Sequence, residues 1–369
     1  MILERLILSE VRNYESLDWM PSARLNVIVG ANAQGKSNLL EAIALLGTGK
    51  SFRTSASGEV VRQSAAVATI FGEARQTASS ARVRLGCRIT LGSRSVRKTY
   101  TVNGHAARYA GYLGRMRVVS FVPGHLQLVT GPPSLRRALL NAALAQDSAP
   151  YYAALAAYER ALTQKGALLR DAAPLDEALL AVYNERLVET GGRLMLARRA
   201  FTVELEERAR TAYRSFAGAS DGWLGLAYVP NIAFELPTDA GVQSAFRAQL
   251  QLLGAAERSR RAALCGPHRD DLRFTLGGEA LAAYGSQGQQ RTAVLAVKVA
   301  EFGFLEARSG DAPILLLDDV LSELDSERRL AFLQALGGYG QAFISSTGPL
   351  EVPDAAVYRV RAATLDQVA

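Results

Sequence analysis

A glycine-rich run near the amino terminus restricts this chain more than any other feature. It matches the pattern Gly-x-x-x-x-Gly-Lys-Ser/Thr and comprises Gly30, Ala31, Asn32, Ala33, Gln34, Gly35, Lys36 and Ser37. An apolar strand pattern at 25–29 leads into the run, and a helical pattern at 36–46 leaves it. This order predicts a phosphate-binding site in an α/β unit, because the backbone N–H groups and the helix N-terminus both favour an anion.

The loop residues have distinct expected roles. Lys36 is expected to contact the β- and γ-phosphates of ATP, and the Ser37 hydroxyl is expected to ligate Mg²⁺. Position 33 is Ala where Gly is expected, so a strained turn is predicted to relax there. The alternative interpretation is a glycine-rich turn that binds nothing.

A second candidate feature is an apolar strand, 314–317, that ends in Asp318 and Asp319. In α/β folds the carboxyl ends of the strands are where ligands bind. Asp318 is therefore expected to hold Mg²⁺, usually through water, and Asp319 to polarise the attacking water. The alternative for Asp319 is a helix N-cap or a loop anchor.

A third feature spans residues 285–291, Gly-Ser-Gln-Gly-Gln-Gln-Arg, and a helical pattern follows it at once. The run resembles the signature motif of ABC-type ATPases. A Ser hydroxyl, a Gly that allows close approach and a helix N-terminus make a second γ-phosphate site. Ser286, Gly288 and Gln289 are its expected contacts. The resemblance implies that this site caps the nucleotide of a second subunit. Ser322-Glu323-Leu324-Asp325 resembles the ABC D-loop.

The remaining patterns divide the chain. Residues 2–8 form a strand pattern, and short strand patterns at 68–73, 82–91, 98–102 and 118–122 with an Asn103-Gly104 hairpin signal predict an antiparallel region. Helical patterns at 151–170 and 176–216 predict a short antiparallel arm or an ordinary helical subdomain, with Gly191-Gly192 as a potential interruption. The end of the chain returns to α/β.

The charge is unevenly distributed. The chain has a formal charge of +7, but residues 50–137 hold 15 basic and 2 acidic residues, so that segment carries +13 and the remainder −6. The segment is either a polyanion-binding face or a set of solvated strand edges that carry arginine. The two cysteines cannot form a disulfide framework, and no apolar run is long enough to span a membrane. We therefore expect a cytoplasmic protein.

Several longer runs resemble the RecF family of bacterial recombination mediators, and the match extends nearly from end to end. The runs are Val11-Arg12-Asn13-Tyr14, Lys50-Ser51-Phe52-Arg53, Phe121-Val122-Pro123, Gly131-Pro132-Pro133-Ser134-Leu135-Arg136-Arg137, Gly266-Pro267-His268-Arg269-Asp270-Asp271 and Leu316-Leu317-Asp318-Asp319-Val320-Leu321-Ser322-Glu323-Leu324-Asp325.

This resemblance implies an ABC-type ATPase head like that of SMC proteins, without a long coiled coil. Lobe I would comprise 1–125 and 300–369, and a mostly helical lobe II, 126–299, would carry the signature. ATP would join two copies on double-stranded or gapped DNA or on single-/double-strand junctions. With RecR and RecO, the dimer would help to load RecA, supporting replication restart and the SOS response. Hydrolysis would be slow and stimulated by DNA, and the expected DNA contacts are Lys50, Arg53, Arg94, Arg97 and Lys98.

Some assignments stay open at this point. The glutamine that senses the γ-phosphate is either Gln63 or Gln127. His268 contacts a nucleotide or lobe interface, or it is a structural residue of its loop. The alternative functions are the ATPase subunit of a transporter, which the absence of a histidine near Thr347 disfavours, and an ATP-controlled scaffold with negligible turnover.

Overall fold

The computed structural model of the chain describes residues 1–93, 95–171, 174–216, 222–321, 329–332, 340–348, 350 and 352–368. The chain forms two compact units: unit 1 comprises Met1–Leu126, Thr211–Gly218 and Arg291–Ala369, and unit 2 comprises Gln127–Arg210 and Ala219–Gln290. The units therefore change at 126/127 and 290/291, whereas the functional lobes were expected to change at 125/126 and 299/300. The predicted lobes remain a prediction.

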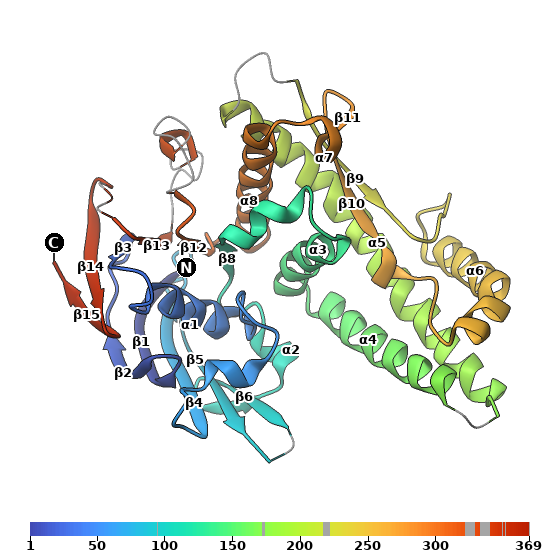
Figure 1. The fold of residues 1–369 in the computed structure, drawn as a ribbon, viewed down its shortest axis with the longest axis horizontal. Coiled ribbons are helices and arrows are strands. Elements are labelled where there is room, and N and C mark those ends of the chain that lie inside the picture. The colour runs from blue at the N-terminus through green and yellow to red at the C-terminus, as the bar shows by residue number, and fades with distance from the viewer. Residues whose placement is uncertain are drawn as a thin grey trace. The chain divides into compact units, whose positions relative to one another are not determined.

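Unit 1 contains a mainly parallel sheet with the order β15-β14-β3-β13-β12-β8, in which only β15 is antiparallel (Figure 1). Its central strands are continuous apolar runs because a parallel sheet is covered on both faces. All five residues of β12 are buried. The strands are β3 (Leu25–Val29), β8 (Val118–Phe121), β12 (Ile314–Asp318), β13 (Gln341–Ser346), β14 (Ala355–Arg361) and β15 (Thr364–Gln367).

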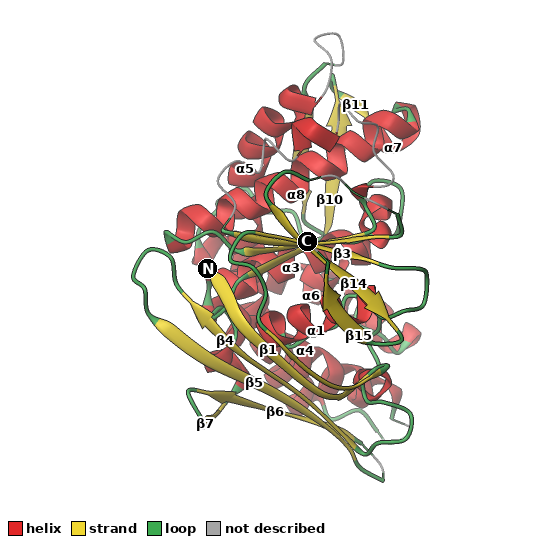
Figure 2. Ribbon diagram, turned by 90° about the vertical axis from the view of Figure 1, so that its left-hand side faces the viewer, coloured by secondary structure: helices red, strands yellow, loops and turns green. Residues whose placement is uncertain are grey.

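Unit 1 also contains an antiparallel sheet with the order β2-β1-β4-β5-β6-β7 (Figure 2). The predicted hairpin is confirmed: Asn103 and Gly104 have φ of 51° and 83°, the two left-handed positions of a type I′ turn. The prediction that 118–122 belongs to this antiparallel region was wrong, because the run forms β8, which pairs in parallel with β12 in the other sheet. The strands are β1 (Ile2–Val11), β2 (Tyr14–Trp19), β4 (Val67–Arg75), β5 (Arg82–Leu91), β6 (Val96–Val102) and β7 (His105–Ala107).

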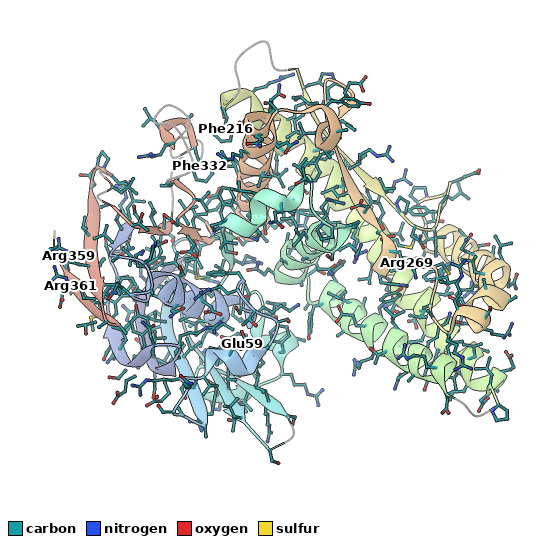
Figure 3. All side chains as sticks on the ribbon, viewed as in Figure 1. Glu59, Phe216, Arg269, Phe332, Arg359 and Arg361 are labelled. Atoms are coloured by element: carbon teal, nitrogen blue, oxygen red, sulfur yellow. The ribbon has the colours of Figure 1, made fainter. Side chains whose placement is uncertain are left out.

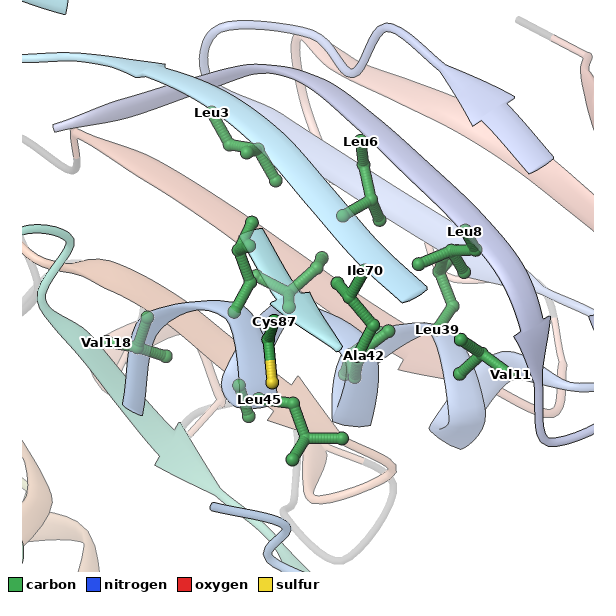
Figure 4. Close-up of a cluster of buried hydrophobic side chains, with 14 of the residues drawn as sticks. Leu3, Leu6, Leu8, Val11, Leu39, Ala42, Leu45, Ile70, Cys87 and Val118 are labelled. Carbon is green, nitrogen blue, oxygen red and sulfur yellow. The ribbon is translucent and has the colours of Figure 1, made fainter. Parts of the chain in front are cut away.

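Helix α1 (Lys36–Thr48) shares one hydrophobic core with both sheets of unit 1. Leu39, Ala42 and Leu45 of α1 meet side chains of the antiparallel sheet such as Leu6 and Ile70 (Figure 4). Burial of each large aliphatic side chain contributes about 1.5–3 kcal/mol. Helix α1, which follows the phosphate loop, is therefore held in place by packing with both sheets of unit 1. Short elements complete this part of the chain: η1 (Ser57–Val60), α2 (Tyr109–Tyr112) and η2 (Pro123–Leu128).

Unit 2 is mostly helical and carries a small antiparallel sheet, β11-β10-β9. Helix α5 runs through Gly191 without a break, so the expected interruption was wrong. A Cβ at Gly191 would lie 2.6 Å from Phe246 and 3.0 Å from Tyr158, so glycine here allows close helix packing. The elements are α3 (Pro133–Asp147), α4 (Ala149–Arg170), α5 (Glu177–Phe216), β9 (Leu224–Val229), α6 (Asp239–Arg260), η3 (Pro267–Arg269), β10 (Asp271–Leu276), β11 (Glu279–Ala280) and α7 (Leu281–Tyr284). The end of α5, from Thr211, belongs to unit 1.

Helix α8 (Gln287–Ser309) begins in unit 2 and continues into unit 1. Among the described residues, no helix combines the length and apolar composition needed to cross a bilayer.

Candidate nucleotide-binding site

The phosphate loop connects β3 to α1, as predicted, and two of its residues have left-handed backbones. Gly35 has φ +122° and Ala33 has φ +65°. Glycine adopts this region freely, whereas an L-residue there costs about 1–2 kcal/mol. The prediction that the turn relaxes at Ala33 was therefore wrong, since the backbone keeps its left-handed conformation despite the methyl group.

Two neighbouring segments brace the loop. Asn13 Nδ2 donates to Gln34 O at 3.0 Å, and the Tyr14 hydroxyl donates to Gly35 O at 3.1 Å. From the β14–β15 turn, the N–H of Ala362 donates to Gln34 Oε1 at 2.7 Å. The Gln34 side chain therefore has a structural partner within its own unit.

The same β14–β15 hairpin explains the first glycine of the loop. A Cβ at Gly30 would lie 2.5 Å from Val360 O, so only glycine fits between β3 and β14. Arg359 and Arg361, two exposed arginines that no motif singled out, lie on β14 just before the turn (Figure 3).

The amino end of α1 is open to an anion. Its N-cap Gly35 supplies no side-chain cap, and the first helical bond runs from Leu39 N to Gly35 O. The preceding N–H groups of the first turn have no intrahelical acceptor. Lys36 is 6% exposed, and its Nζ donates to Gly30 O at 2.7 Å and to Ala31 O at 2.9 Å. Burial lowers the pKa of Lys36, and the nearby Asp319 and Asp318 oppose that shift. A polyphosphate bound in the loop would offer the Lys36 ammonium negatively charged acceptors in place of these neutral carbonyls.

The two predicted metal ligands are in contact although 281 positions separate them in the sequence. The Ser37 hydroxyl donates to Asp318 Oδ1 at 2.8 Å, and Asp318 is 7% exposed at the end of β12. A hydroxyl and a carboxylate are oxygen ligands of the kind that Mg²⁺ takes beside a nucleotide, so the residues present fit that ion.

Asp319, the predicted water-polarising acid, follows β12 with φ +53°. Its N–H donates to Ser345 Oγ at 3.0 Å. Ser345 Oγ also donates to Asp318 Oδ1, which accepts from Ser37, so a chain of hydrogen bonds links Asp319 to the phosphate loop. The structure therefore brings Lys36, Ser37 and both acids together. The D-loop segment 322–325 lies outside the described residues.

Glu41, a buried acid on α1, forms hydrogen bonds with residues of the runs 11–14 and 50–53. The Glu41 side chain is 1% exposed and accepts from Arg12 Nε and Nη2, each at 2.8 Å. It also accepts from the Ser51 hydroxyl, and the Arg53 guanidinium lies 3.9 Å away. Arg53 in turn donates to Oδ1 of Asn38, the residue after Ser37. Sequence analysis gave Glu41 no role, because a single Glu within a helical pattern has no distinctive spacing.

The signature run forms a reciprocal cap at the start of α8. Ser286 Oγ accepts from Gln289 N at 3.2 Å, and Gln289 Oε1 accepts from Ser286 N at 2.9 Å. This is a capping box, which holds the helix N-terminus in one conformation. Ser286, Gly288 and Gln289 lie in unit 2, whereas the phosphate loop lies in unit 1. Their contact with nucleotide stays a prediction.

The run 266–271 is organised by one buried and one partly buried ion pair in unit 2. Arg198, which is 2% exposed, donates to Asp270 Oδ2 at 2.8 Å, and Arg136 pairs with Asp271 at 2.6 Å. His268 Nδ1 is 2.6 Å from the Tyr158 hydroxyl, and burial lowers the pKa of His268 to about 4. These contacts favour the structural interpretation of His268.

The expected DNA contacts differ in their surroundings. Arg97 projects from the exposed side of β6, and Lys50 is exposed beyond α1. Lys98 is partly buried, donates to Gly49 O at 2.9 Å and has a pKa lowered by burial, so it caps α1. Arg94 lies outside the described residues.

Arg88 on β5 belongs to the basic segment 50–137 but was not among the expected DNA contacts. Its neighbour Thr90 pairs with Arg97, and alternation places Arg88 and Arg97 on the same sheet face. Within the described part of the chain, neither arginine is in an ion pair. Only the strand register reveals this proximity.

Comparison with known proteins decides the family. A model described as the RecF/RecN/SMC N terminal domain matches residues 2–358. The DNA replication and repair protein RecF of Symbiobacterium thermophilum is 41% identical, over 99% of this chain and 98% of that protein. The chain belongs to the RecF family. RecF of Enterococcus faecalis agrees at 34% identity, over 96% of this chain and 94% of that relative.

Solved structures support the same assignment. The recombination mediator protein RecF-ATP in the RecFOR pathway has a TM-score of 0.91 at 29% identity, covering 100% of this chain and 98% of that one. An Smc head bound to the C-winged helix domain of ScpA has a TM-score of 0.51 at 15% identity, covering 100% and 97%, and shares the fold alone. The family resemblance and the SMC-like ABC ATPase head of the RecF fold are therefore confirmed.

Proposed function

We propose that this RecF-family chain is an ATP-hydrolysing, DNA-binding protein of recombinational repair. The observation that carries the proposal is the hydrogen bond from Ser37 to Asp318, which joins the phosphate loop to the strand that ends in two acids. Relatives named DNA replication and repair protein RecF, and the RecF-ATP structure, support the repair role and the nucleotide.

The residues divide the work at one site. The open N–H groups of α1 and the Lys36 ammonium bind phosphate oxygens, and binding replaces the contacts of Lys36 with the loop carbonyls. Ser37 and Asp318 would hold Mg²⁺, which supplies charge neutralisation on the phosphates. Asp319 accepts a hydrogen bond from the attacking water and orients it toward the γ-phosphate.

Two copies complete the catalytic arrangement. The Ser286 hydroxyl, which caps α8, accepts a hydrogen bond from the N–H of Gln289, but its proton stays available to an anion. The α8 N-terminus adds favourable positive potential. In the proposed head-to-tail homodimer, Ser286, Gly288 and Gln289 of one copy cap the nucleotide of the other. ATP therefore stabilises the dimer, and hydrolysis releases it.

DNA binds through basic residues of unit 1. The proposed contacts are Arg88, Arg97 and Lys50, because these side chains are exposed on or near the antiparallel sheet. Duplex, gapped and junction DNA are the proposed ligands in the cytoplasm, where the dimer acts with RecO and RecR to load RecA. Turnover is proposed to be slow and stimulated by DNA.

ATP binding, turnover and mass measured together test the nucleotide function. Lys36→Met should abolish ATP binding, while Asp319→Asn should bind ATP, hydrolyse it slowly and accumulate as a dimer in light scattering. Ser286→Arg should bind ATP as a monomer. ATP-dependent dimers of Ser286→Arg would contradict the head-to-tail homodimer. Equal turnover of wild type and Asp319→Asn would favour an ATP-controlled scaffold with negligible turnover.

A salt titration tests the DNA surface. Replacing Arg88 and Arg97 by Ala should weaken binding and reduce the salt slope by about 2, since each lost phosphate contact removes about 1. Arg75→Ala is the matched control, because Arg75 on the same sheet is already paired with Glu4 at 2.7 Å. A DNA affinity that does not depend on salt would overturn the proposed DNA-binding surface. ATP hydrolysis that DNA does not stimulate would favour a transporter-type ATPase.

A further inference from the structure

Ser345 is a buried hydroxyl that touches both acids of the candidate site. It is 2% exposed and lies near the end of β13. Its hydroxyl donates to Asp318 Oδ1 at 2.7 Å and accepts from the N–H of Asp319 at 3.0 Å. One side chain therefore bonds to the carboxylate of the first acid and to the backbone of the second.

The strand register explains how Ser345 reaches both. Ser345 of β13 pairs with Asp318 of β12 in the parallel sheet. Beyond Asp318 the chain leaves the strand through Asp319, whose left-handed φ of +53° is uncommon for a residue other than glycine. A partly buried N–H at such a position needs an acceptor, and Ser345 supplies it.

We propose that Ser345 is a positioning residue of the ATPase reaction, which sets the Asp318 carboxylate for Mg²⁺ and the Asp319 carboxylate for water. This inference rests on the proposed ATPase function. Asp318 Oδ1 receives two hydroxyl donors, Ser37 and Ser345. Ser37 is itself an expected metal ligand, so its bond to Asp318 changes when the ion binds. The bond from Ser345 stays in place and keeps the orientation of the carboxylate.

The expected effect follows from the loss of a buried partner of a metal ligand. Removing such a group typically costs about 10- to 100-fold in metal affinity or activity. Ser345→Ala should therefore lower kcat by about 10- to 100-fold and weaken the binding of Mn²⁺ in the presence of ADP by a similar factor. The affinity for ADP with EDTA present should stay within about twofold, because the phosphate-loop contacts do not include Ser345.

Mn²⁺ binding is followed by electron paramagnetic resonance, alongside steady-state ATP hydrolysis and ADP titration. Ser346→Ala is the matched control: Ser346 is the next residue of β13, and its hydroxyl donates to Gly348 O at 2.9 Å, away from the acids. If Ser345→Ala fails to fold, Ser345→Cys replaces it. Cysteine still fills the position of the serine side chain, but its thiol is a poor hydrogen-bond donor and acceptor.

The outcomes separate the two proposals. Wild-type Mn²⁺ affinity and kcat in the folded Ser345 variant would overturn the positioning role while leaving the ATPase intact. A wild-type chain that does not hydrolyse ATP would overturn the proposed function itself. A loss confined to Ser345 variants, with Ser346→Ala unchanged, supports the inference.

Discussion

The buried acid Glu41 offers a sharp test of how the phosphate loop is supported. Its carboxylate accepts two bonds from Arg12 at 2.8 Å and a third from the Ser51 hydroxyl, and its side chain is 1% exposed. Glu41→Gln keeps the size of the side chain but removes the charge and turns one acceptor into a donor that faces the Arg12 guanidinium.

The magnitude follows from burial. Breaking a fully buried pair costs about 3–5 kcal/mol, and the Arg12 side chain is 18% exposed, so water recovers part of that loss. We expect Glu41→Gln to lower the free energy of unfolding by about 3 kcal/mol. One kcal/mol shifts the melting temperature of a unit of roughly 200 residues by about 2–4 °C, so the midpoint should fall by about 6–12 °C.

The loop should loosen as well. The residues that follow Arg12 brace the phosphate loop, since Asn13 and Tyr14 donate to the carbonyls of Gln34 and Gly35. ATP affinity of Glu41→Gln should therefore fall even at temperatures where the variant is folded. Calorimetric melting and ATP titration at 10 °C measure the two effects separately.

A matched control uses the same geometry at the surface. Arg5 grips Asp18 through two bonds of 2.8 and 2.6 Å, but both side chains are exposed, so Asp18→Asn should leave the melting temperature and ATP affinity nearly unchanged. Equal small effects of Glu41→Gln and Asp18→Asn would refute the argument that the buried network supports the loop.

Three further outcomes are expected. Gly30→Ala should lose at least tenfold in ATP affinity, because its Cβ would lie 2.5 Å from a backbone carbonyl of β14; wild-type affinity would contradict that fit. Lys165→Met should destabilise the chain in urea unfolding by about 3–5 kcal/mol, since it leaves the Glu257 carboxylate buried without its cation; an unchanged transition would refute this. Burial lowers the pKa of His268 from 6.5 to about 4. The neutral His268 side chain therefore contributes fully to folding stability above pH 6.5, and this contribution is lost as the pH falls toward 4. His268→Gln should flatten that part of the stability profile, and an unchanged acid slope would contradict the assignment.

Local patterns predicted much of the candidate site. The strand–loop–helix order at 25–46 and the acids after 314–317 were readable because a phosphate loop needs particular residues at particular spacings. The continuous helix at Gly191 was missed because an isolated glycine pair is usually a weak point of a helix, and only the neighbouring Phe246 and Tyr158 show why a glycine stands at 191.

The amino-acid sequence by itself determined the class of site, the family and the segments that carry the chemistry, because these depend on residue types that are close in the chain. Tertiary structure alone decided which side chains meet. Ser37 reaches Asp318, Ser345 reaches both acids, Lys98 caps a helix, and Arg88 lies on the same sheet face as Arg97. Strand order and register set these contacts, and both depend on packing between distant parts of the chain.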